Sequence, residues 1–165
     1  MRIRQQKLYL LILILSCSAV AAALGGGLFG QSVSWQFQWQ HEAFQQLCHQ
    51  LPSRSFWIAG QPMAVCSRCF GIYASFALSW ILIPFIGYLM GINIKGSATL
   101  LAIALISNIF DVAGNFLGFW ENTLFSRFLF GVGIGTAVVI FLIGYFINDL
   151  NIKKEYCYGY NRAIK

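Results

Sequence analysis

Three cysteines and a histidine that could bind a metal ion are concentrated in one short stretch of the chain. Cys48 and His49 are adjacent, and Cys66 and Cys69 have the Cys-x-x-Cys spacing with which two thiolates chelate one ion. Three cysteines and one histidine are a ligand set of tetrahedral zinc sites. We therefore predict a zinc site formed by Cys48, His49, Cys66 and Cys69, with His41 as an alternative histidine.

The same thiols also suit redox chemistry. A Cys-x-x-Cys pair at the end of a membrane helix can carry out thiol–disulfide exchange, and Arg68, between Cys66 and Cys69, favours their thiolate forms. Membrane thiol oxidases usually relay electrons to a second cysteine pair, which this sequence lacks. A structural disulfide would leave one spare thiol. Cys17, inside an apolar run, and Cys157, in the C-terminal tail, are not expected to take part.

The composition indicates a membrane protein. The 165 residues are 58% hydrophobic and only 10% charged, whereas soluble domains carry about 25% charged residues. Apolar runs at about 8–29, 70–90, 99–119 and 128–147 each approach the length of about 20 residues that crosses a bilayer. In the last run, Gly131, Gly133 and Gly135 are expected to form a small-residue face for close helix packing, and Gly131 and Gly135 have the small-xxx-small spacing. We predict an all-α membrane protein: a four-helix transmembrane bundle formed by one domain, residues 1–165.

The basic residues predict the orientation of these spans. Lys and Arg cluster in segments 1–7 and 148–165, and Lys95 lies in the turn 91–96. Such residues favour the cytoplasmic side. We expect a multi-pass protein of the cytoplasmic membrane with both termini inside and the Cys/His loop, residues 30–69, outside. An interfacial helix is expected from Ser34 to Leu51. If the first run is instead a cleaved signal peptide, the loop still lies outside.

One acidic residue interrupts the third apolar run. Asp111 shares a helical face with Asn108 and Asn115, and a carboxylate at this depth is costly unless it is paired or protonated. We expect Asp111 to face the bundle interior and to pair with Arg68 or Arg127. These three charged residues are the candidate catalytic residues. The alternative is a polar clamp that only holds the helices together.

These residues resemble a family of small bacterial membrane proteins, domain of unknown function 2085. The family pattern is Cys-His-Gln, Pro-x-Arg-Ser-Phe and Cys-x-Arg-Cys-x-Gly-Ile-Tyr, followed by an intramembrane Asp and then by Asn, Arg and spaced glycines. The matching residues are Cys48, His49, Gln50, Pro52, Arg54, Ser55, Phe56, Cys66, Arg68, Cys69, Gly71, Ile72, Tyr73, Asp111, Gly118, Asn122, Arg127, Gly131 and Gly135. The resemblance covers roughly residues 43–135. Segment 112–115 departs from the Gly and Gln of the family pattern, and the resemblance implies no activity.

Three functions therefore stay open at the level of sequence. The first is a membrane protein whose outer loop binds zinc, and the second is a thiol–disulfide oxidoreductase that uses Cys66 and Cys69. The third is a small transporter or accessory subunit that uses Asp111. The net charge of +6 fits topology signals and lipid headgroups rather than nucleic acid. The expected partner is the lipid bilayer, and a homo-oligomer is compatible with the sequence.

Overall fold

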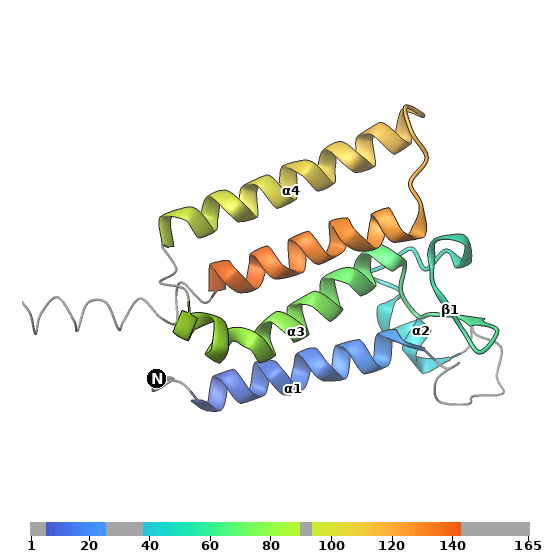
Figure 1. Cartoon of the computed structure of the whole chain (residues 1–165). Coiled ribbons are helices and arrows are strands. Elements are labelled where there is room, and N and C mark those ends of the chain that lie inside the picture. The colour runs from blue at the N-terminus through green and yellow to red at the C-terminus, as the bar shows by residue number, and fades with distance from the viewer. Residues whose placement is uncertain (1–5, 26–37, 90–93, 143–165) are drawn as a thin grey trace, which may run out of the picture.

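The computed structural model describes residues 6–25, 38–89 and 94–142 of the chain, and the long helices dominate this part. They are α1 (Gln6–Ala23), α3 (Ser67–Leu89), α4 (Ile94–Phe116) and a further helix, Leu124–Leu142, which we call helix 124–142. Figure 1 shows them side by side in the order α4, helix 124–142, α3 and α1, with directions that alternate along the chain.

Three helices in the described part of the chain are long and apolar enough to cross a membrane. They are α1, the Gly96–Phe116 part of α4, and helix 124–142. The prediction of an all-α membrane protein is therefore confirmed. In addition, α3 has 23 residues, which exceeds the length of about 20 residues needed for a crossing.

The helix ends differ from the predicted spans by a few residues, for local reasons. The third span was expected to reach residue 119, but α4 ends at Phe116 because Gly118 adopts a φ of 77°. The N–H of Gly118 donates to Asn115 O, and that of Phe119 donates to Gly114 O, which is the Schellman pattern of a helix C-terminus. Helix 124–142 begins four residues before the predicted 128. The expected ends at 29, 90 and 147 lie outside the described residues.

Helices α1 and α3 are held together by a reciprocal pair of hydrogen bonds. The hydroxyl of Tyr9 donates to the carbonyl of Trp80 at 3.1 Å, and the indole N–H of Trp80 donates to the carbonyl of Tyr9 at 3.2 Å. Their rings also stack, with centroids 5.7 Å apart. Trp80 is buried against Val139 of helix 124–142, so this cluster joins three helices.

Glycines allow α3 and helix 124–142 to approach closely. A Cβ on Gly131 would overlap the carbonyl of Arg68, and a Cβ on Gly135 would overlap the Ser75 side chain and the carbonyl of Ile72. Gly71 on α3 faces the backbone of helix 124–142 in the same way. The predicted small-residue packing face is confirmed for Gly131 and Gly135, but the prediction was wrong for Gly133. By contrast, open space surrounds the Cβ position of Gly133.

In α4 only a narrow polar stripe is buried. Asn108, Asp111 and Gly114 are buried at helical spacing, as the sequence predicted for the first two. The other faces expose large apolar side chains: Leu100, Ile103, Leu105, Ile106, Ile109, Phe110, Val112 and Phe116. Such a surface suits lipid rather than water.

The described part of the loop between α1 and α3, residues 38–66, lies at one end of the long helices (Figure 1). It contains α2 (Trp39–Phe44), the 3-10 helix η2 (Pro52–Arg54), and strands β1 (Trp57–Ile58) and β2 (Gln61–Pro62), which pair antiparallel with Trp57 opposite Pro62. A helix through Leu51 was expected, and this was wrong, because α2 ends at Phe44 and turns follow. Pro52 opens the 3-10 helix rather than ending α2. Residues 34–37 of the expected helix lie outside the described residues.

Candidate metal centre and the cavity beside it

The sulfur atoms of Cys48, Cys66 and Cys69 converge. All three lie within 4.8 Å of one another. Cys48 follows the turn after α2, Cys66 directly precedes α3, and Cys69 belongs to its first turn. The loop fold thus brings Cys48 to the Cys-x-x-Cys pair, as the sequence predicted, and the group forms part of a cluster with Phe44 and Val65.

Gln50 holds the two arms of this loop together. Its side-chain amide donates to the carbonyl of His41 at 2.6 Å and to that of Ala64 at 2.9 Å. The Gln50 backbone has a positive φ of 49°, which turns the chain sharply after His49. The N–H of Ala64 donates to the carbonyl of Ala23 at the end of α1. These bonds fix Cys48 relative to Cys66.

Hydrogen bonds among the thiols lower the pKa of Cys66. The side chains of Cys48 and Cys69 hydrogen-bond to Cys66 and hold its pKa well below the usual value for a thiol. The bond to Cys66 raises the pKa of Cys48 in turn. The backbone N–H of Cys66 donates to Cys48 Sγ at 3.2 Å, and a donor of this kind favours a thiolate. Thiolates are the ligand form of cysteine.

The two histidines lie differently from the cysteines. His49 is exposed and lines the cavity beside the thiols, but the cluster found in the described residues contains the three cysteines without it. His41 is also outside this cluster, and burial lowers the pKa of its imidazole. The identity of a fourth ligand therefore stays a prediction.

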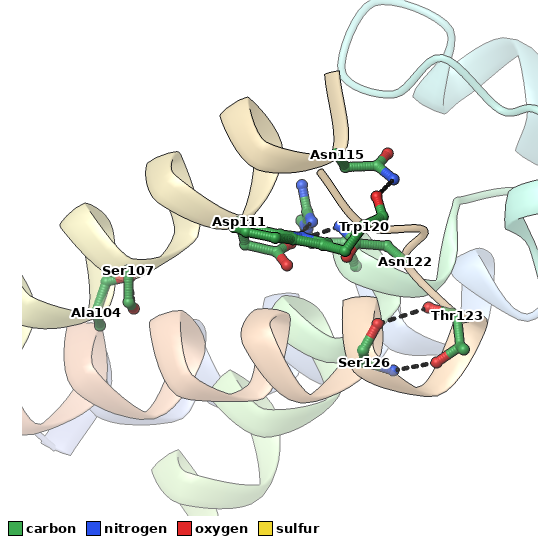
Figure 2. A network of polar contacts seen from close by, with 9 residues as sticks. Ala104, Ser107, Asp111, Asn115, Trp120, Asn122, Thr123 and Ser126 are labelled. Carbon is green, nitrogen blue, oxygen red and sulfur yellow. Dashed lines mark hydrogen bonds and ion pairs between the residues drawn. The ribbon is translucent and has the colours of Figure 1, made fainter. Parts of the chain in front are cut away.

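Asp111 faces the interior and is paired. Its side chain is buried and forms an ion pair with Arg68, and the side-chain amide of Asn122 donates to the same carboxylate oxygen at 2.8 Å. Figure 2 shows Asp111 and Asn122 converging from α4 and the segment that follows it. Pairing with Arg68, one of the two predicted partners, is confirmed. Arg68 lies between Cys66 and Cys69, so the acid is linked directly to the Cys-x-x-Cys segment.

The segment after α4 positions Asn122. The side-chain amide of Asn115 donates to the carbonyl of Trp120 at 2.9 Å, as Figure 2 shows. The Trp120 ring occupies the space where a Cβ on Gly114 would lie. Thr123 then caps helix 124–142, because its hydroxyl accepts from the N–H of Ser126 at 3.1 Å.

A cavity of about 300 Å³ opens beside the thiols. Arg54, Arg68 and Arg127 line it, and they come from η2, α3 and helix 124–142 respectively. The remaining lining residues are Leu47, Cys48, His49, Leu51, Cys66, Cys69, Val112, Asn115 and Asn122. The structure thus gathers at one cavity the four predicted metal ligands and the predicted candidates Arg68 and Arg127, while Asp111 lies behind Arg68.

Aromatic packing attaches the arginine-bearing turn to the helices. The ring of Phe56, two residues after Arg54, contacts Phe70 of α3 and Phe128 of helix 124–142, with centroids 6.4 Å and 5.9 Å away. Phe70 and Phe128 stack on each other at 6.0 Å. This three-ring contact holds η2 over the junction of α3 and helix 124–142.

The sequence matches the model of a family of membrane proteins. The family model described as "Predicted membrane protein (DUF2085)" matches residues 48–141, and the chain belongs to this family. The uncharacterized protein MJ1492 of Methanocaldococcus jannaschii is 36% identical over 68% of this chain and 72% of its own length. An uncharacterized protein of Methanothermobacter thermautotrophicus is 35% identical over 58% of this chain and 86% of its own. No solved structure matches.

Sequence reasoning missed the roles of two amides at this site. Gln50 and Asn122 were noted only as matches to the family pattern, but one holds the loop and the other binds the Asp111 carboxylate. Gln50 directly follows the Cys-His pair, so its position was an available signal. Nothing local in the sequence indicates that Asn122 folds back onto Asp111.

Proposed function

We propose that this protein is an integral membrane metalloprotein whose loop binds zinc through Cys48, Cys66 and Cys69, with His49 as the candidate fourth ligand. The observation that carries the proposal is the convergence of three thiol sulfurs within 4.8 Å of one another. Tetrahedral zinc with Zn–S bonds of about 2.3 Å places its sulfurs about 3.8 Å apart. Small side-chain movements would bring the three atoms to that spacing.

The surroundings of the thiols also support a metal centre. A disulfide uses two thiols, whereas a zinc ion uses all three that converge here. The thiols are among the buried and half-buried groups of a packed loop, and Gln50 holds their relative positions. Such support orients metal ligands and tunes their affinity.

The fourth position decides what kind of zinc site this is. Rotation of the exposed His49 side chain toward the thiols would complete a closed Cys3His site, which is structural in character. If water holds that position instead, the site is open, as catalytic zinc sites are. We propose the closed form, because His49 follows Cys48 directly and lines the same cavity.

We further propose four membrane crossings, with α3 as the fourth, and place the loop on the outer side. The alternating helix directions in Figure 1 support this, because they put the Cys/His loop and the segment between α4 and helix 124–142 at the same end. The Lys and Arg residues of segments 1–7, 91–96 and 148–165 support a cytoplasmic location for the opposite end.

Elemental analysis of detergent-purified protein tests the zinc site. We expect about one zinc per chain in the wild type, since one three-thiol group binds one ion, and loss of zinc in Cys66→Ser. The matched control is Cys17→Ser, because Cys17 is exposed on α1 and outside the cluster. Its zinc content should equal that of the wild type. His49→Ala should weaken zinc binding less than Cys66→Ser does.

The same samples test the second candidate, a membrane thiol–disulfide oxidoreductase. The lowered pKa of Cys66 favours that candidate, because the thiolate is the attacking species in exchange. Zinc-free protein in which free thiols are lost on oxidation and restored by dithiothreitol would reject the metal site in favour of redox chemistry. We do not favour transport through Asp111, because Arg68 and Asn122 already occupy its carboxylate.

A further inference from the structure

Three guanidinium groups line the cavity beside the thiols, and in the part of the chain that the structure describes one of them is paired with a carboxylate. Arg68 is paired with Asp111. Within the described residues, Arg54 and Arg127 form no ion pair with a carboxylate, although both line the same cavity as Arg68. Like charges gathered in a half-enclosed space repel one another more strongly than in water. An anion bound between these groups would therefore stabilise the arrangement.

Two amides add hydrogen-bond donors to the cavity lining. The side chains of Asn115 and Asn122 line the cavity, and each donates one N–H, to Trp120 O and to the Asp111 carboxylate respectively. Because an amide NH₂ group has two hydrogens, each side chain carries one further donor. Hydrogen bonds from guanidinium groups to phosphate or carboxylate oxygens are short and strong, and they are often bidentate.

We propose that this cavity binds a phosphate group. The arginines come from three separate elements, and the several oxygens of a tetrahedral phosphate can accept from all of them, whereas a planar carboxylate has two. A volume of about 300 Å³ is at the lower end of the range for small-molecule sites. It accommodates a phosphate together with part of the group that carries it.

The inference deepens the proposed function, because it assigns an anionic ligand to the cavity next to the proposed zinc. The net charge of the groups around the cavity is positive with or without zinc. A zinc ion with three thiolates carries a single negative charge. With the Asp111 carboxylate added, three guanidinium groups still leave a net positive charge for a ligand in either case.

The phosphate has two sources that share this chemistry: a lipid headgroup and a free phosphate compound. Titration calorimetry with inorganic phosphate measures whether the protein, purified in lipid-free detergent, binds free phosphate. The ionic strength is held constant with chloride. Native mass spectrometry of gently purified protein tests for a retained phospholipid. Arg54→Gln and Arg127→Gln are the test variants, and Arg54 lies on an exposed turn whose substitution should not disturb folding. The control is Lys7→Gln, because Lys7 is exposed at the opposite end of α1.

We expect each arginine variant to weaken phosphate binding at least about tenfold, which corresponds to one charged hydrogen bond, or to lose the retained phospholipid. Lys7→Gln should behave as the wild type in both measurements. Absence of both forms of binding in the wild type, or binding that neither arginine variant weakens, would overturn the proposal. Zinc is counted in the same samples. Arginine-dependent binding without zinc would reject only the metal site, and zinc without such binding would reject only the phosphate site.

Discussion

At the scale of single residues, the structure links the thiols to a buried acid through Arg68. This residue lies between Cys66 and Cys69 in sequence, and its guanidinium group pairs with Asp111 of α4. Asn122 donates to the same carboxylate. One arginine therefore joins the loop end of α3 to α4. We regard Arg68 as the residue through which changes at Asp111 reach the thiol cluster.

The first prediction concerns removal of this acid. Asp111→Ala leaves the Arg68 charge uncompensated and should destabilise the protein by about 3–5 kcal/mol, the usual cost of breaking a buried pair. Asp111→Asn retains an acceptor for Arg68 and Asn122 and should be less destabilising. Denaturant titration in detergent micelles provides the measurement, with Ser107→Ala on the exposed face of α4 as the control.

Equal stabilities of the two Asp111 variants would contradict this account of the pair. The double variant Arg68→Gln/Asp111→Asn adds a further check, because residues in direct contact are not additive. We expect it to lose less stability than the sum of the two single variants. Additive losses would mean that the pair contributes no coupling.

At the scale of elements, the contact between α3 and helix 124–142 depends on positions where no side chain fits. Gly131 and Gly135 face the backbone of α3 at residues 68 and 72, and Gly71 faces the backbone of Phe128. This close approach sets the distance between Arg68 and Arg127, which lie on the two helices near the same end. The packing of glycines therefore shapes the arginine cavity.

Replacing Gly131 by alanine tests this contact. The added methyl group would overlap the carbonyl of Arg68, so the helices must separate, at a cost of about 1–3 kcal/mol for overpacking. Gly133→Ala is the matched control, since it meets open space and gains helix propensity of up to about 1 kcal/mol. Thermal unfolding in detergent should place the Gly131 variant below the wild type and the Gly133 variant at or above it. The reverse order would reject the glycine contact.

At the scale of the whole molecule, all the functional features lie at one end of the helices. The Cys/His loop, the end of α4 and the start of helix 124–142 meet there. The exposed apolar faces of α4 extend away from this end. If the helices cross a bilayer, the cavity lies at one membrane surface, within reach of both solutes and lipid headgroups.

At this scale we predict the side of the membrane on which the site lies. Reporter fusions at Lys165 and near Gln61 should report opposite sides of the membrane, with the C-terminus cytoplasmic, because Lys and Arg favour the inner side. Thiol labelling of intact cells with a membrane-impermeant reagent gives a second measurement. Ser53 is exposed in η2, so Ser53→Cys should be labelled more strongly than its matched control, Ser53→Ala. Equal labelling of the two variants, or a C-terminal reporter that is active outside, would reject the orientation.

The sequence by itself determined the membrane class, the approximate helices, the candidate thiol ligands and the need for a partner at Asp111. These follow from composition, apolar run length and the cost of a charge in hydrocarbon, which are properties of local segments. The tertiary structure decided which residues meet. Arg68 rather than Arg127 pairs with Asp111, Asn122 folds back onto the acid, and Gln50 joins two loop arms. The helix predicted in the loop is shorter in the structure for the same reason. The turns that follow α2 place Cys48 in a cluster with Ala23 of α1 and Tyr73 of α3. These residues are distant in sequence, and no local pattern encodes such contacts.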